Sequence, residues 1–171
     1  SSRPAHSIAG ETGRGEVRFM IYLLAWYAQD FLWVLGAGKV LVPEIFLLTL
    51  VFLSLFRSED GVRVVWAAFL GGVLWDLRWT GFPGISSLIY VLSLMSVRWI
   101  WHSIPASGRT ITLFGFLLWS ANMPIALGRI FLWGARGIEV WRAYLLQQSH
   151  IVPLVLLACA AYAWRLKNQD V

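Results

Sequence analysis

Asp76 is the side chain in this sequence whose type and position raise the question of chemistry most directly. It stands near the end of an apolar run, and Gly81, Pro83 and Gly84 form a turn after it. An ionised group in lipid costs about 2.5–3.5 kcal/mol at a helix centre, so it needs a partner or a use. Asp76 is either a counter-ion or helix-end partner for Arg78 or a neighbouring helix, or a proton or substrate site. The lack of a second carboxylate at matching spacing favours the first interpretation.

We expect no enzyme, because the sequence lacks the motifs that build known kinds of active site. It contains no His-Glu-x-x-His, no Gly-x-Ser-x-Gly and no glycine-rich phosphate loop. Ser149 and His150 are neighbours rather than a dyad, and Asp30 and Asp76 lack the context of the facing aspartates of an intramembrane protease. No cluster of metal-ligand types is present in the sequence. We therefore expect no cofactor and no metal ion.

Other polar residues inside apolar runs have structural explanations. Gln29 and Asn122 are neutral, and such residues in spans usually form hydrogen bonds between helices. Pro124 predicts a kink beside Asn122. Glu44 follows Pro43 in the first turn of the second apolar run, where its negative charge interacts favourably with the helix dipole. We expect water to reach Glu44 at this position.

Small residues form two overlapping pairs on one apolar run. Ala67 pairs with Gly71, and Ala68 pairs with Gly72, each at a spacing of four. Such pairs let a second helix approach closely. The second helix belongs to this chain or to another protein, and we favour this chain.

Composition places these residues in a membrane protein. Of 171 residues, 58% are hydrophobic and 13% charged, against about 25% charged in soluble domains. The charges cluster between long apolar runs, which predicts an all-α integral membrane protein with a compact bundle of about six transmembrane helices. Residues 18–171 then form one transmembrane domain, and 1–17 a disordered tail or expression remnant, with a native start near Val17 or Met20. The expected spans are 19–35, 43–56, 64–79, 85–101, 111–127 and 150–166.

Charge in the loops predicts the orientation. An even number of spans puts both termini on one side, and the more basic side is expected to be cytoplasmic. This reading explains the net charge of +5 without nucleic acid. The basic residues on the side of the termini are Arg18, Arg57, Arg63, Arg98, Arg109, Arg165 and Lys167, and those on the other side are Lys39, Arg78, Arg129, Arg136 and Arg142.

The stretch 129–148 has two interpretations that the sequence leaves equal. Ile138, Trp141, Tyr144 and Leu145 have helical spacing. They predict either a short amphipathic helix lying on the outer surface, or an extension of the last span with a kink at Pro153.

Taken together, these residues resemble the MreD family of rod shape-determining membrane proteins of bacteria. The match begins with Gln29 and continues with Pro43 and Glu44, where the family usually has Pro-Asp. Its clearest part is 71–77, with Gly71, Gly72 and Asp76, followed by the turn 81–84. The resemblance covers about 18–167.

The resemblance implies a non-enzymatic scaffold or regulatory subunit of the cell-elongation complex, which makes peptidoglycan and maintains rod shape. Such a protein lies in the bacterial inner (cytoplasmic) membrane and binds MreC. Through MreC it acts on the RodA glycosyltransferase, a penicillin-binding transpeptidase and MreB filaments.

The family's fold is similar to the substrate-binding subunits of energy-coupling-factor vitamin transporters, which supplies the alternative of a substrate-capture subunit. Ala25 and Ala28 do not have the Ala-x-x-x-Ala spacing that those subunits tend to use for docking, and few polar side chains could converge on a vitamin. The analogy also predicts a capped cavity at the outer face, beneath 129–148, that holds a lipid or a partner's segment.

Overall fold

The computed structural model describes residues 8–36, 42–56, 61–132 and 138–169, and its regular elements within these ranges are all helical, as expected. A π-helical turn, Asp76–Thr80, follows the third helix, and a 3-10 turn, Ala106–Gly108, precedes the fifth. Helix covers part of the 1–17 stretch expected to be a tail, while residues 1–7 lie outside the described ranges. The helices are α1 (Ile8–Leu35), α2 (Ile45–Phe56), α3 (Gly61–Trp75), α4 (Ile85–Ser103), α5 (Ile111–Ala121), α6 (Met123–Leu132) and α7 (Ile138–Gln169).

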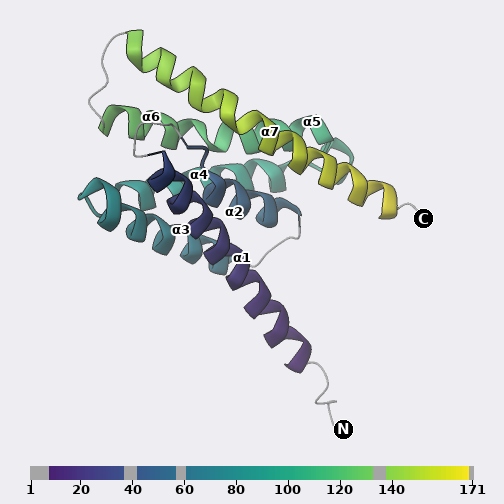
Figure 1. The fold of residues 1–171 in the computed structure, drawn as a ribbon. Coiled ribbons are helices and arrows are strands. Elements are labelled where there is room, and N and C mark those ends of the chain that lie inside the picture. Colours follow the sequence, from purple (N-terminus) through teal and green to yellow (C-terminus); the bar gives the residue numbers. More distant parts are fainter. Residues whose placement is uncertain (1–7, 37–41, 57–60, 133–137, 170–171) are drawn as a thin grey trace.

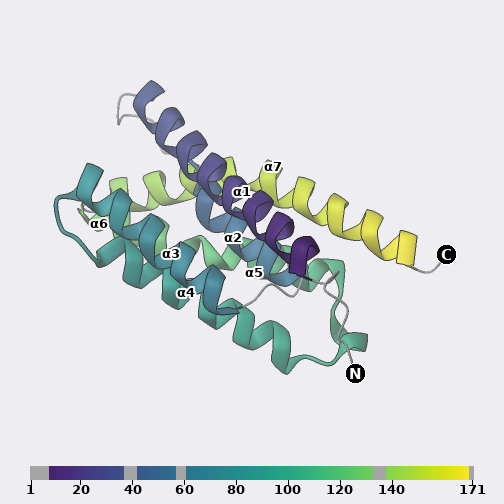
Figure 2. The same cartoon turned by 90° about the horizontal axis from the view of Figure 1, so that it is seen from below.

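Helix α2 lies at the centre of the bundle. It packs against α1, α3, α4 and α5 (Figures 1 and 2), and most of its side chains are buried. A helix that is apolar on all sides is expected to be buried among other helices in this way. Its 12 residues extend about 18 Å, well short of a hydrocarbon core of about 30 Å.

Helices α3 and α4 form a close antiparallel hairpin. A Cβ on Gly72 would collide with the backbone of Ser87, so α4 lies directly over this glycine. The Ser87 hydroxyl donates to the Phe69 carbonyl over 2.9 Å. A Cβ on Gly71 would likewise collide with the Phe46 ring of α2. The small residues of α3 therefore pack within this chain.

The fifth expected span is broken where the sequence predicts a kink. Helix α5 ends at Ala121, Asn122 links the two helices, and α6 begins at Met123. Helix α6 also runs to Leu132, beyond the expected end at 127.

Helix α7 decides between the two interpretations of 129–148. It is continuous from Ile138 through Pro153 to Gln169, so the second half of that stretch extends the last helix, which begins well before the expected position 150. The separate surface helix was the wrong alternative for residues 138–148. Residues 133–137 lie outside the described ranges.

The direction of the helices defines two ends of the bundle. Helix α1 begins and α7 ends at one of them, called here the terminal end (Figures 1 and 2). The opposite end, called the turn end, holds the α3–α4 turn and the start of α7. Two stretches, Ile111–Leu132 and Glu139–Asn168, are long and apolar enough to cross a membrane.

Candidate functional site

The centre of the turn end is a buried ion pair between Glu44 and Arg129. Glu44 immediately precedes α2, and Arg129 lies on α6. Arg129 Nη2 donates a hydrogen bond to Glu44 Oε2 over 3.0 Å, and Nη1 lies 2.8 Å from Oε1 as an ion-pair contact. The two side chains are 0% and 4% exposed. A charge in such a place is stable only when it is paired and hydrogen-bonded.

Two further helices donate hydrogen bonds to the same carboxylate. The Tyr90 hydroxyl on α4 donates to Glu44 Oε2 over 2.8 Å, and Gln29 Nε2 on α1 donates to it over 3.0 Å. Gln29 Oε1 accepts the Phe46 N–H over 2.9 Å, which satisfies a donor in the first turn of α2. Glu44, Arg129, Tyr90 and Gln29, called here the Glu44 cluster, thus join α1, α2, α4 and α6.

Aromatic rings cover the cationic side of the cluster. The Arg129 guanidinium carbon lies 4.1 Å from the centroid of Trp75 and 5.5 Å from that of Trp33. Both rings are buried, so the cation–π attraction acts away from water. The rings close the cluster against α3 and the end of α1.

The position of Glu44 corrects the sequence interpretation. We expected a helix-end carboxylate that water can reach, but Glu44 is fully buried and its main partner is 85 residues away. We expected Arg129 in a loop on the side opposite the termini, whereas it lies on α6 and pairs with Glu44. The sequence places both residues on the same side of the expected bundle, Glu44 at the beginning of one apolar run and Arg129 after the end of another, but it does not pair them.

Asp76 caps the beginning of α4. Its Oδ2 accepts the N–H groups of Gly84 and Ser86 over 2.8 and 2.9 Å, and its Oδ1 accepts the Thr80 hydroxyl over 3.2 Å. A carboxylate here satisfies orphan donors and meets the positive end of the helix dipole. The φ values of Gly81 and Gly84, +69° and +109°, require glycine in the intervening turn, where Pro83 is exposed.

Arg78 has another carboxylate as its partner. Its Nε is 2.8 Å from Asp30 Oδ1, which also accepts the Trp79 indole N–H over 2.8 Å. Asp76 is therefore the helix-end partner of the first interpretation, acting on α4 rather than on Arg78. Both arrangements fasten the α3–α4 turn, the second of them to α1.

Pro43 is the chain neighbour of Glu44, and its carbonyl accepts the Ile45 N–H over 2.8 Å. The small residues of α3 and Asn122 have other surroundings. Ala68 is buried and Ala67 half-buried, while the Gly71 carbonyl accepts the Trp26 indole N–H from α1 over 3.0 Å. Asn122 is fully buried, but its amide forms no hydrogen bond with the rest of the described structure. The cross-helix bond expected of Asn122 is thus missing there.

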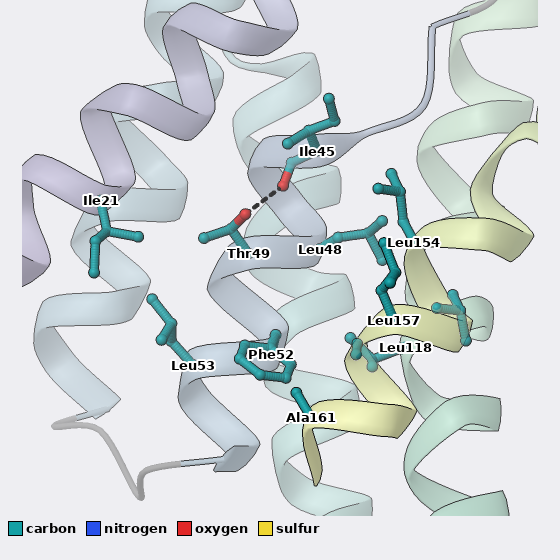
Figure 3. A pocket seen from close by; sticks show the side chains of 12 residues that line it. Ile21, Ile45, Leu48, Thr49, Phe52, Leu53, Leu118, Leu154, Leu157 and Ala161 are labelled. Atoms are coloured by element: carbon teal, nitrogen blue, oxygen red, sulfur yellow. Dashed lines mark hydrogen bonds between the residues drawn. The ribbon is translucent and has the colours of Figure 1, made fainter. Parts of the chain in front are cut away.

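The capped cavity beneath 129–148 stays a prediction, because residues 133–137 lie outside the described ranges. An apolar groove of about 380 Å³ lies on the side of the bundle, between α1 and α7 with α2 as its floor (Figure 3). It is lined by Ile21, Ile45, Leu48, Thr49, Phe52, Leu53, Leu118, Leu154, Val155, Leu157, Ala158 and Ala161.

The geometry of these residues is suited to holding helices together. Both oxygens of Glu44 and of Asp76 already accept hydrogen bonds or an ion-pair contact. Among the described residues, no three His, Cys, Asp or Glu side chains are grouped to hold a metal ion. Comparison of the chain with protein-family models, with curated proteins and with solved structures returns no match.

Proposed function

We propose that this protein is a six-span scaffold subunit of the bacterial cell-elongation complex, that it binds MreC, and that it catalyses no reaction. The observation that carries the proposal is where the MreD-like residues lie. Gln29 and Glu44 belong to the cluster that joins four helices, and Asp76 with Gly81 and Gly84 forms the cap of α4. These residues serve the shape of the bundle, as a scaffold requires.

The surface supports a membrane location. Large apolar side chains are exposed along α1, α3, α4 and α7, whereas soluble monomers rarely expose wide apolar patches. Examples are Phe19, Leu24, Phe31, Trp66, Leu70, Leu88, Leu92, Leu156 and Leu157.

The distribution of charge supports a cytoplasmic terminal end. More of the described basic side chains lie there than at the turn end, which has Arg78, Arg129 and the exposed Arg142. Of these three, Arg129 is paired with Glu44 and Arg78 with Asp30. Lys39, Arg57 and Arg136, which the orientation argument also used, lie outside the described residues. The described basic residues of the terminal end are Arg18, Arg63, Arg98, Arg109, Arg165 and Lys167.

The apolar groove supports helix docking over vitamin capture. Among the described residues that line the groove, Thr49 is the one with a polar side chain, and its hydroxyl already donates to the Ile45 carbonyl of the same helix over 2.8 Å (Figure 3). A vitamin site needs several polar groups that converge on the ligand. Ala158 and Ala161 have small side chains on the α7 side of the groove, so a spanning helix of a partner such as MreC could approach closely.

Co-purification in detergent with MreC, read by mass spectrometry, tests the proposal. We expect stoichiometric MreC with the wild-type chain and at least a tenfold lower recovery with Ala161→Trp, which fills the groove. Ala160→Trp is the matched control, because Ala160 is exposed on α7 and does not line the groove. Recovery of an ATPase pair with a bound vitamin, and no MreC, would contradict the proposal and favour the transporter subunit.

A further inference from the structure

Helices α3 and α4 form one side of the bundle, opposite α7 (Figures 1 and 2). One face of α4 carries a stripe of exposed apolar side chains, spaced alternately by three and four residues. The 81–84 turn bounds this α4 stripe at the turn end, and the exposed His102 and Ser103 bound it at the terminal end. The members of the α4 stripe are Ile85, Leu88, Leu92, Met95 and Trp99.

The apolar height of the hairpin is short for a membrane span. Ile85 and Trp99 are fourteen residues apart, which is about 21 Å along an α-helix, whereas a hydrocarbon core is about 30 Å thick. Helix α3 has 15 residues and extends about 22 Å. The turn that follows α3 holds Arg78, whose side chain is 52% exposed. A charged group therefore lies close to the end of the apolar face of α3.

Tryptophan side chains stand at both limits of the hairpin. Trp79 is exposed in the π-helical turn at the turn end, and Trp99, which is 74% exposed, ends the α4 stripe. Tryptophan is enriched at the level of lipid headgroups. These two positions indicate that lipid, rather than another helix, covers the face between them.

Helix α7 is longer, but its continuous apolar part has a similar height. Residues 151–164 contain no charged side chain and extend about 20 Å. Before them, exposed polar residues such as Arg142 and His150 are interspersed with apolar ones, as in segments that lie at a membrane surface. The rings of Trp101 and Tyr162 lie 6.0 Å apart, so the apolar parts of α4 and α7 end at a similar level.

We propose that this protein thins the bilayer beside the α3–α4 hairpin and therefore binds phospholipids with short acyl chains in preference to longer ones. A long helix such as α7 can reduce its height by tilting, but a short hairpin cannot become longer, so the lipid adapts to it. The inference rests on the membrane-spanning bundle of the proposed function, but it does not require MreC. It also accounts for the short α2 and α3 in such a bundle.

Reconstitution of the full chain into phosphatidylcholine vesicles tests the inference. Dimyristoleoyl, dioleoyl and dierucoyl phosphatidylcholine each compete with a brominated dioleoyl lipid, which quenches the tryptophan fluorescence of the chain on contact. We expect the dimyristoleoyl lipid, which has the shortest chains, to bind about threefold more tightly than the dioleoyl lipid. Strongest binding of the dioleoyl or the dierucoyl lipid, or equal binding of all three, would overturn the inference.

A change in the height of the hairpin tests the cause of the preference. His102→Leu with Ser103→Leu extends the α4 stripe to about 27 Å and should bring the dimyristoleoyl and dioleoyl lipids to near parity. The matched control is Ser96→Leu, which adds an apolar side chain at an exposed position within the stripe and leaves its height unchanged. An equal effect of the control would contradict the inference, because total hydrophobicity rather than height would then set the preference.

A single cysteine tests whether a second copy of the chain covers the hairpin instead. Leu92 is 55% exposed in the middle of the α4 stripe. In a chain with Cys159 replaced by alanine, Leu92→Cys should form no disulfide between copies in dilute vesicles. A disulfide-linked dimer would overturn the inference, because protein rather than lipid would cover this face.

The outcomes separate this inference from the proposed function when MreC recovery in detergent is measured on the same preparations. Recovery of MreC with strongest binding of the dioleoyl lipid would overturn only the thinning of the bilayer. A preference for the dimyristoleoyl lipid without MreC would contradict only the scaffold role. Release of the chain from vesicles at alkaline pH would contradict the membrane location on which both depend.

Discussion

At the scale of single residues, the pairing of Glu44 with Arg129 explains how both charged side chains can be buried. Each one, buried singly, would carry a desolvation penalty of several kcal/mol. As a pair they carry no net charge, and Tyr90 and Gln29 donate hydrogen bonds to the carboxylate. The pair fixes the end of α6 against the start of α2, which an apolar contact would do less specifically.

The first prediction concerns the charge of Glu44. Glu44→Gln leaves Arg129 buried without a counter-charge, so the free energy of unfolding should fall by about 3–5 kcal/mol. Glu44→Gln combined with Arg129→Met should recover most of this loss, because no unpaired charge remains. The measurement is the thermal midpoint in detergent, followed by tryptophan fluorescence.

The Asp30–Arg78 pair provides the control for this prediction. The Arg78 side chain is 52% exposed, so Arg78→Gln should change stability by at most about 1 kcal/mol. If the double variant at Glu44 and Arg129 is no more stable than Glu44→Gln alone, the charge argument is wrong.

Sequence distance explains which residue roles could be predicted. Asp76 forms hydrogen bonds with groups four, eight and ten residues away, so the local sequence could predict its role as a helix-end partner. Glu44 has partners on α1, α4 and α6, which only the packing of the bundle brings together. A single sequence carries no signal that pairs Glu44 with Arg129 rather than with water.

At the scale of elements, the contact between α3 and α4 depends on Gly72. A side chain there would strike the Ser87 Cα and N atoms, and backbone cannot rotate away as a side chain can. The Ser87 hydroxyl bond to the Phe69 carbonyl crosses the same contact. The spacing of small residues predicted such a contact, but it did not identify the helix that makes it.

The second prediction compares two glycines on helices. Alanine raises helix propensity by about 1 kcal/mol at either position, so a difference between them reports the contact. Gly72→Ala should lower the free energy of unfolding by about 1–3 kcal/mol through overpacking. Gly128→Ala should be neutral or stabilising, because its Cβ would meet only the tip of the Ile89 side chain, which can move. Equal thermal midpoints for the two variants would contradict the close α3–α4 contact.

Helix boundaries show what local patterns can and cannot decide. Asn122 and Pro124 mark the α5–α6 break, because proline disfavours the helical hydrogen bonds that precede it. Pro153 carries the same signal, yet α7 continues through it. The difference comes from packing: α7 lies along both α5 and α6, which hold it on either side of the proline.

At the scale of the whole molecule, apolar and charged side chains are separated along the bundle. Exposed apolar residues run along α1, α3, α4 and α7, and the described basic residues of the terminal end lie near the ends of these helices and in the link between α4 and α5. The carboxylates Asp30, Glu44 and Asp76 are buried toward the turn end. The positions of charges between apolar runs predicted the more basic end, whereas the lateral groove follows from side-chain packing that this pattern does not specify.

The last prediction tests the orientation that this separation implies. In a chain with Cys159 replaced by alanine, single cysteines report each end: Phe82→Cys in the exposed α3–α4 turn, and Ser107→Cys in the exposed link between α4 and α5. Because the more basic end is retained in the cytoplasm, a membrane-impermeant maleimide should label Phe82→Cys in spheroplasts. Ser107→Cys should react only after the membrane is permeabilised. The reverse pattern would place the basic end outside, and labelling of both sites in intact spheroplasts would contradict a bundle that separates them across a membrane.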